Sequence, residues 1–326
     1  MPLSSLRRGT ILLVVVFVVS ACARDDPPAL RLAINPWPGY GFFYIAQQQG
    51  FTADVGVDLE IVDTMSLRDS RLAFERGQVN LIGATPLELV QIARRADREA
   101  RAVLVLDHSM SGDVILARPP VSAVRDLRGR DVAVEPGSVN LLVLASALEK
   151  AGVPASDVRL APMPQSAMPD ALADGEVSAA VTYPPFSDRM ERLPEVRRIF
   201  DTTESPDTVV DVLVASKAII RQRPDALRRL MRAYQRALDW ARANPAAATE
   251  LLARRSSQNS NEIRRALERI RMIGLREQRD YWGENGHLTG AVRRSIAALE
   301  AFDGRSIDLD PEYLLDGRAL KKATGR

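Results

Sequence analysis

The sequence predicts an α/β protein with two lobes, each built on a mostly parallel β-sheet flanked by helices. Its 326 residues are too many for one ordinary small domain and suit two lobes that each bury a core. Hydrophobic residues make up 46% of the chain and charged residues 26%, a balance typical of soluble globular proteins. Strand-like apolar runs alternate with helical patterns, and this β-α-β order favours parallel strands with helices on both faces.

The first 21 residues are predicted to be an export signal. Arg7 and Arg8 precede an uncharged apolar run over residues 11–19, which is shorter than the roughly 18 to 20 residues of a spanning helix. The segment from Val19 to Cys22 closely resembles a bacterial lipobox, in which the cysteine takes lipid and becomes the new N-terminus. The alternatives are an ordinary signal peptide with a chance cysteine and a twin-arginine signal. We expect an exported protein at the periplasmic face of a bacterial membrane, lipid-anchored through Cys22.

Cysteine content and charge limit the possible chemistry and partners. Cys22 is the only cysteine, which excludes an intramolecular disulfide and a cysteine-based metal cluster. Cleavage before Cys22 takes Arg7 and Arg8 from the 44 basic residues and leaves 42, against 42 acidic residues. A formally neutral chain without a basic patch interleaved with aromatics argues against nucleic acid as a partner. Residues 22–28 are predicted to form a proline-stiffened tether.

The first lobe is expected to begin directly after this tether. Strands are predicted over residues 30–34, 57–62, 79–83 and 102–106, with helices over 41–49 and 67–76 and a third that begins at Pro86. Gly50 and Gly77 end two of these helices because glycine suits the left-handed position after a helix. Pro86 opens the third helix, where a missing N–H costs least. A polar turn is expected over residues 108–113.

The second lobe is expected to repeat the same alternation on a smaller scale. Its strands are predicted over residues 114–117, 131–134, 158–161, 177–182 and 196–200, with helices over 139–150 and 166–173. A strand over 208–216 and helices over 224–243, 245–254 and 261–274 follow, and we expect them to pack on the first lobe. The chain then crosses between lobes near Asp113 and Asp211. The predicted bounds are 29–113 and 211–326 for lobe 1 and 114–210 for lobe 2.

Five segments carry a resemblance to a known family. They are Asn35 to Tyr40 (NPWPGY), Asp126 to Val134 (DLRGRDVAV), Glu135 to Ser138 (EPGS), Gly175 to Val181 (GEVSAAV) and Val210 to Val214 (VDVLV). In their order and spacing they resemble solute-binding proteins of ABC importers, in the nitrate/sulfonate/taurine-type group. That group includes relatives that bind thiamine-pyrimidine precursors. The resemblance covers residues 30 to about 274.

The resemblance implies a type II periplasmic binding protein fold, with two lobes that hinge around a ligand cleft. It implies capture of a small organic solute, a sulfonate, an amine or a pyrimidine-like ring, for delivery to the permease and ATPase subunits of an importer. We expect a monomer with no cofactor, no metal and no catalytic residue. One alternative is a sensory lipoprotein of the same fold. Another is a pyrimidine-synthase-like enzyme, but such relatives use a cysteine-rich motif that this chain lacks.

Candidate ligand contacts follow strands, where open α/β sheets bind ligands. Trp37 is held between Pro36 and Pro38 and suits a planar ligand or a cation, although it could also cover the core. Tyr40, three residues further on, could also lie at the mouth of the cleft. Thr85 and Ser138 each precede a helix, where N–H groups could receive a ligand anion or where each side chain could simply cap the helix.

The remaining candidates lie near the predicted crossovers. Carboxylates at Asp113 and Asp211 would favour a ligand amine, amidine or protonated heterocycle, and would make an inorganic anion such as nitrate a poor candidate. Either could instead pair with an arginine. Ser109 lies in the turn before the first crossover. Tyr183 ends a strand of the second lobe and could close over the ligand opposite Trp37.

An enzyme that binds a dinucleotide is the main alternative for the segment Gly39-Tyr40-Gly41-Phe42-Phe43-Tyr44. This segment follows a strand and opens a helix, as a dinucleotide-binding turn does. That turn requires a small residue at position 44 so that helix and strand pack closely, and Tyr44 stands there. The chain also has no G-x-S-x-G elbow and no H-E-x-x-H motif. A binding protein is therefore favoured.

Overall fold

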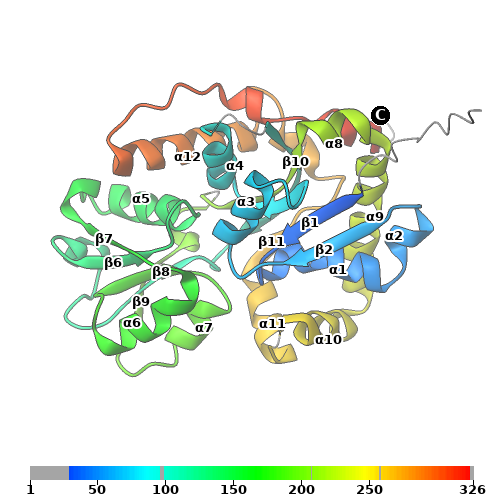
Figure 1. Ribbon diagram of the computed structural model, residues 1–326. Helices are drawn as coiled ribbons and strands as arrows, with labels where there is room; N and C mark the ends of the chain where they lie inside the picture. The colour runs from blue at the N-terminus through cyan, green and yellow to red at the C-terminus, as the bar shows by residue number, and fades with distance from the viewer. Residues whose placement is uncertain (1–28, 96–98, 207, 257, 324–326) are drawn as a thin grey trace, which may run out of the picture.

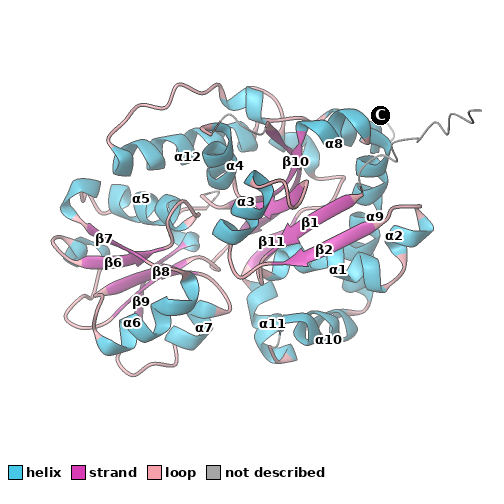
Figure 2. Cartoon of the chain, in the orientation of Figure 1, coloured by secondary structure: helices cyan, strands magenta, loops and turns pink. Residues whose placement is uncertain are grey.

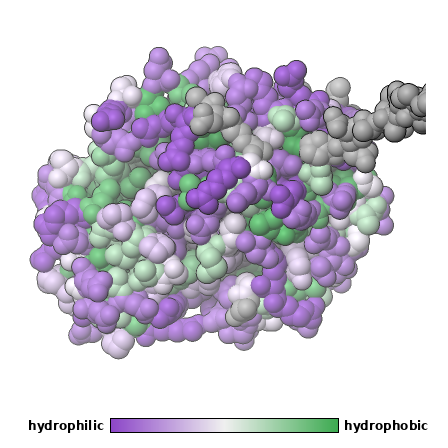
Figure 3. Space-filling model, in the orientation of Figure 1, coloured by the Kyte–Doolittle hydropathy of each residue, from purple (hydrophilic) through white to green (hydrophobic). Residues whose placement is uncertain are grey.

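The computed structural model describes residues 29–95, 99–206, 208–256 and 258–323, which form two lobes side by side (Figure 1). The predicted export signal, Cys22 and the tether lie outside these residues and stay predictions. Among the described residues, no helix is both long and apolar enough to cross a membrane. The face seen in Figure 3 is largely hydrophilic, with apolar residues visible over part of the second lobe.

The first lobe surrounds a six-stranded sheet with the order β11-β4-β10-β3-β1-β2. β1 pairs in parallel with β2 and β3, whereas β10 runs antiparallel to its neighbours β3 and β4. β1 to β4 therefore share one direction, as predicted. The strands are β1 (Leu30–Ile34), β2 (Leu59–Asp63), β3 (Leu81–Ala84), β4 (Ala100–Ser109), β10 (Val210–Ser216) and β11 (Ile270–Met272).

The second lobe holds a five-stranded sheet with the order β7-β6-β8-β5-β9. β6 pairs in parallel with β7 and β8, and β5 runs antiparallel to β8 and β9. Its strands are β5 (Val114–Ala117), β6 (Asp131–Val134), β7 (Arg159–Pro162), β8 (Ala179–Thr182) and β9 (Arg197–Asp201). The chain passes between the sheets twice, before β5 and before β10, and we propose that these passages bound the lobes.

Helices cover both faces of each sheet (Figure 2). The helices of the first lobe are α1 (Gly41–Gln48), α2 (Phe51–Asp54), α3 (Leu67–Glu75), α4 (Pro86–Ala93), α8 (Lys217–Gln222), α9 (Pro224–Ala243), α10 (Pro245–Ser256), α11 (Ser260–Glu268) and α13 (Arg318–Ala323). The second lobe has α5 (Asn140–Lys150), α6 (Met168–Asp174) and α7 (Phe186–Met190). The helix α12 (His287–Asp303) contacts both α4 and α5, so it spans the two lobes.

Short 3-10 helices complete the connections: η1 (Pro38–Tyr40), η2 (Val124–Leu127), η3 (Ala155–Asp157), η4 (Gln165–Ala167), η5 (Thr202–Glu204), η6 (Gln278–Tyr281) and η7 (Pro311–Leu314). Local chemistry explains where several helices begin. Ser66 accepts a hydrogen bond from the Asp69 N–H at the start of α3. Thr85 and Glu88 form a capping box at the start of α4.

The structure corrects two local predictions around the edge of the first sheet. The predicted helix over 261–274 ends at Glu268, and β11 follows it. The predicted polar turn begins too early, because His108 and Ser109 are the last residues of β4. β11 pairs antiparallel with this end of β4, which satisfies backbone groups that a bare edge would leave unpaired. That tertiary pairing overrides the helical pattern of the segment.

Candidate functional site

A small cavity lies between the lobes, where segments that follow β1 and β3 meet the passages between the sheets. Its volume is about 10 Å³, which is room for about one water molecule. A larger solute therefore requires the lobes to separate. Both lobes and the passages contribute to the wall, which consists of Asn35, Trp37, Leu67, Thr85, Asp113, Val139, Tyr183, Val209 and Asp211.

Two aromatic rings meet edge to face at this cavity. Trp37 follows β1 of the first lobe and Tyr183 follows β8 of the second, and their centroids lie 6.1 Å apart at an interplanar angle of 88°. The indole Nε1 of Trp37 donates to Asp107 Oδ1 at 3.1 Å, which fixes the ring. The Tyr183 hydroxyl accepts a long hydrogen bond of 3.5 Å from the Leu67 N–H of the first lobe. Each lobe thus presents one aromatic wall.

Five buried carboxyl groups surround the same region: Glu88, Asp107, Asp113, Glu135 and Asp211. Burial raises the pKa of Asp107, Asp113 and Glu135 to about 7 in each case. Burial also raises the pKa of Asp211 well above its usual range, and the nearby Asp107 carboxyl adds to this effect. None of the nine residues that line the cavity is basic. The cleft is therefore strongly acidic without an arginine or lysine in its wall.

Asp211 in the cavity wall and Asp107 behind it form a carboxyl pair. Their side chains hydrogen-bond each other, so one of the two carries a proton when the pair is intact. The Tyr40 hydroxyl donates to Asp211 Oδ1, while Trp37 holds Asp107. A Cβ atom at Gly39 would lie 2.1 Å from Asp107 Oδ2, so only glycine allows this close approach.

Two buried acceptor atoms in the wall have no hydrogen-bond partner within the described residues. They are Asn35 Oδ1 and Asp113 Oδ2, whereas the Asp211 carboxyl group hydrogen-bonds that of Asp107. The backbone N–H of Asp113 donates to Ser109 Oγ at 3.0 Å, which positions its carboxyl group. Buried polar atoms are normally paired, and unpaired ones are costly. These acceptors have no donor in the wall, and a solute that carries N–H groups would supply one.

The two helix N-termini predicted to receive a ligand anion are occupied by the protein itself. The Glu88 carboxylate accepts from the Thr85 N–H at 2.8 Å and from the Val139 N–H of the second lobe at 2.8 Å. Thr85 also caps α4 by accepting from the Leu87 N–H at 3.2 Å. An anionic ligand group would have to displace Glu88. Glu88 therefore fills both anion sites, and its bond from the Val139 N–H joins the lobes.

Five of the eight predicted contact residues line the cavity: Trp37, Thr85, Asp113, Tyr183 and Asp211. Tyr40, Ser109 and Ser138 are buried outside the lining set. Tyr40 therefore lies behind the wall and not at the mouth of the cleft, since its buried hydroxyl donates to Asp211. Whether any of these residues contacts ligand stays a prediction.

Sequence reasoning missed part of the wall and most of its acidity. Asn35, Leu67, Val139 and Val209 line the cavity, and Glu88, Asp107 and Glu135 add buried carboxyls near it. A signal existed for some of them. Asn35 directly follows β1, and Asp107 is a lone carboxylate at the end of the apolar run of β4. Among the described residues, no group of three or more histidine, cysteine, aspartate or glutamate side chains could hold a metal ion.

Comparison with known proteins places the chain in a family. A family model described as NMT1/THI5 like matches residues 37–248, which is more than half of the chain. The chain belongs to the NMT1/THI5-like family. A relative from Brucella abortus (strain 2308), provisionally named as a binding protein, is 26% identical over 259 residues. That match covers 76% of this chain and 79% of the relative.

Solved structures show the same two-lobed architecture. The periplasmic aliphatic sulphonate binding protein SsuA from Escherichia coli matches with a TM-score of 0.73 at 17% identity, covering 89% of this chain and 92% of that one. The desulfurization enzyme DSZB matches with a TM-score of 0.62, also at 17% identity, covering 91% of this chain and 99% of that one. The fold of this member of the NMT1/THI5-like family is that of type II periplasmic binding proteins, as predicted. The fold alone carries both binding proteins and an enzyme.

Proposed function

We propose that this protein is the extracytoplasmic solute-binding component of an ABC importer and captures a small organic cation between its lobes. Membership of the NMT1/THI5-like family and the likeness to a periplasmic binding protein support the general role. One observation carries the choice of solute. The unpartnered acceptors Asn35 Oδ1 and Asp113 Oδ2 belong to one cavity whose wall has no basic side chain.

The chemistry of the wall defines the solute further. A protonated amine, amidine or heterocycle would donate to Asp113 and neutralise its charge, next to the carboxyl pair of Asp107 and Asp211. Trp37 and Tyr183 would contact a planar ring or a cation through their faces. A sulfonate would instead meet several carboxyl groups, which repel it. An amine-bearing or pyrimidine-like solute is therefore favoured over the sulfonate class.

Closure of the lobes is the mechanism that couples binding to delivery. Besides Glu88, the lobes are joined by Arg269, which lies 3.3 Å from Asp188 and 3.7 Å from Glu191. A solute needs the lobes further apart than in this structure, and its contacts with Asp113, Trp37 and Tyr183 would then hold the lobes closed around it. It would shift the population of the protein toward closure. The closed form then docks on a permease, while the predicted lipid at Cys22 keeps the protein at the membrane.

A matched pair of ligands tests the proposed solute class. Benzylamine and benzenesulfonate carry the same ring and opposite charges, and aminopyrimidines and putrescine extend the series. We expect cationic members to raise the melting temperature, by the equivalent of about 2.7 kcal/mol at one hundred times the dissociation constant. Stabilisation by benzenesulfonate and by no amine would contradict the proposal. Chemical turnover of a bound solute would instead favour an enzyme of this fold.

A further inference from the structure

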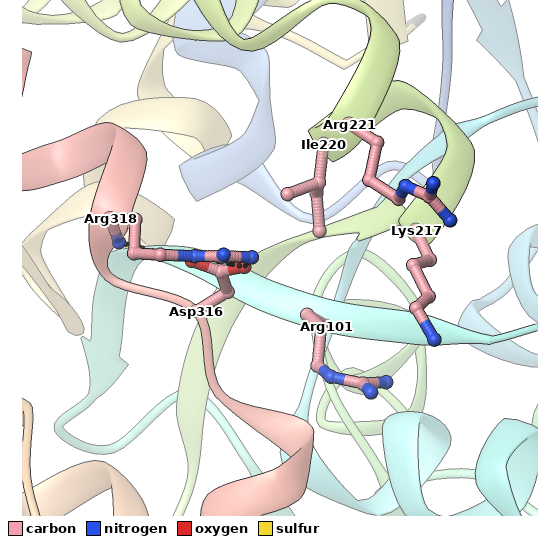
Figure 4. Close-up of a pocket in the computed structure, with 6 residues that line it drawn as sticks. All are labelled: Arg101, Lys217, Ile220, Arg221, Asp316 and Arg318. Atoms are coloured by element: carbon pink, nitrogen blue, oxygen red, sulfur yellow. Dashed lines mark hydrogen bonds and ion pairs between the residues drawn. The ribbon is translucent and has the colours of Figure 1, made fainter.

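A basic recess lies at the end of the first-lobe sheet opposite to the cleft. Its volume is about 320 Å³, and it is lined by Arg101, Lys217, Ile220, Arg221, Asp316 and Arg318. Figure 4 shows the basic groups arranged around a common hollow, with Ile220 on one side. Arg101 comes from the start of β4, Lys217 and Arg221 from α8, and Arg318 from the start of α13. Three distant segments thus bring positive charge to one place.

The positive charge of this recess is only partly neutralised. Arg318 pairs with Asp316 at 2.5 Å, and Lys217 pairs with Glu99. Arg221 makes no ion pair with any acidic residue that the structure describes. Four basic side chains against the carboxylates of Asp316 and Glu99 leave a formal charge of +2. The recess therefore favours an anion, and Arg221 is the group most free to receive one.

An exposed aromatic side chain borders the same recess. The Arg101 guanidinium lies 3.7 Å from the centroid of the Tyr313 ring, and the Tyr313 hydroxyl donates to Glu99 Oε1 at 2.5 Å. Tyr313 is nevertheless 50% exposed, which makes it one of the few large hydrophobic residues exposed in the described chain. Tyrosine beside basic side chains is typical of surfaces at the level of lipid headgroups, where one end of the ring is apolar and the other is wet.

The recess also lies beside the point where the chain enters the fold. Asn80 donates from Nδ2 to the Ala29 carbonyl at 2.8 Å, and the Ser216 N–H donates to the Asn80 carbonyl at 3.0 Å. Lys217 is the next residue. Two strand spacings separate β1 from β10, so Ala29 lies about 10 Å from the start of α8. A chain that arrives from a membrane at Ala29 would bring this face close to the bilayer.

We infer that the recess of Arg101, Lys217, Arg221 and Arg318, with Tyr313 at its rim, docks on the phosphate groups of an anionic phospholipid bilayer. The seven residues 22–28 span at most about 25 Å, so an anchor at Cys22 would let this face touch the membrane. β4 is ten residues long, which places the cleft about 30 Å from the recess. Docking on the bilayer therefore leaves the cleft free to capture solute.

Vesicle co-sedimentation tests this surface without any contribution from a lipid anchor. The chain from residue 22, with Cys22→Ser, contains every described element, because both sheets lie within residues 30–272. We expect it to bind vesicles of phosphatidylcholine mixed with phosphatidylglycerol, and to bind phosphatidylcholine alone much more weakly. The double variant Lys217→Gln, Arg221→Gln should bind the anionic vesicles at least about tenfold more weakly, since each basic side chain near the surface contributes several-fold.

A charge-matched control separates this recess from general charge effects. Arg254→Gln with Arg264→Gln removes the same charge from α10 and α11, on the other side of the lobe from α8 (Figure 1). This control should bind like the parent protein, and the single variant Arg221→Gln should show a smaller loss than the double variant. Equal loss in the control, or no preference for phosphatidylglycerol, would overturn the inference. Binding of inorganic phosphate by the parent protein, together with unchanged vesicle binding by the double variant, would assign the recess to a soluble anion and also overturn the inference.

Discussion

At the end of the first-lobe sheet that faces the cleft, Asp107, Asp113 and Asp211 are buried, and burial raises the pKa of each. At the opposite end, the side chains of Lys217 and Arg318 are 43% and 80% exposed, and each pairs with a carboxylate. The two ends of the sheet carry charges of opposite sign, but the larger difference is that one set of charged groups is buried and the other is exposed to solvent. A buried, unpartnered charge is costly until a ligand compensates it, whereas an exposed basic group keeps its charge and attracts anions weakly. This difference suits selective capture at one end and reversible surface contact at the other.

The largest expected effect is the pH dependence of stability that the cleft creates. Asp113 has a folded-state pKa of about 7 against 3.8 for the free side chain, so the folded protein binds the proton more tightly. Its stabilising contribution is complete below about pH 4 and is lost as the pH rises through 7, by up to about 4 kcal/mol. Asp107 and Glu135 act in the same direction.

Chemical denaturation of the unliganded protein between pH 4 and 8 measures this effect. We expect Asp113→Asn to flatten the curve and to stabilise the protein near pH 8 relative to the parent. The exposed Asp308→Asn, which removes an acid far from the cleft, should leave the slope unchanged. Equal slopes for the parent and Asp113→Asn would contradict the assignment of a buried protonated carboxyl group to this site.

The second expected effect is on affinity for a cationic solute. The double variant Asp113→Asn, Asp211→Asn keeps the shape of the wall, removes the charge of Asp113 and breaks up the carboxyl pair of Asp107 and Asp211, so affinity should fall about 100-fold. Calorimetry with a cationic hit from the ligand series measures it. For the parent, affinity should also increase as the pH rises through about 7, because Asp113 loses its proton. Unchanged affinity in the double variant would show that the solute binds elsewhere.

The third expected effect is a loss of stability on substitution of Gly39, which leaves room for the Asp107 side chain of the carboxyl pair. Gly39→Ala would place a methyl group 2.1 Å from Asp107 Oδ2, so we expect a loss of about 1 to 3 kcal/mol in the free energy of unfolding. Gly290→Ala is the matched control, since its nearest neighbour would be the Arg294 side chain at 3.4 Å within α12. The control should be neutral or stabilising by up to about 1 kcal/mol.

The smallest expected effect tests whether the two ends of the sheet are independent. Lys217→Gln with Arg221→Gln should change affinity for a cationic solute by less than about twofold, because exposed charges about 30 Å away are screened by salt. The same calorimetric titration provides the comparison. A large change would show that the recess and the cleft are coupled, and that the fold does not separate their roles.

Most of the fold could be predicted because periodicity and local chemistry are carried by neighbouring residues. The strands β1, β5 and β6 begin and end where the sequence predicts, and Pro86 and Pro224 open helices as expected. The segment Ile270–Met272 could not be predicted in this way, because its strand exists only through pairing with β4. A helical pattern of a few residues is too weak to override that pairing.

The sequence by itself determined the two-lobed architecture and the positions of Trp37 after β1 and Asp113 before β5, since strand order dictates which ends face the cleft. Asp211, expected at a crossover, is the second residue of β10. Only the tertiary structure decided what surrounds these residues. Asp107 meets Asp211, and Glu88 meets Val139, across long stretches of chain. The physical reason is that the charge state of a carboxyl depends on its burial and on its neighbours in space. Those neighbours, rather than the residue itself, make the cleft a site that favours a cation.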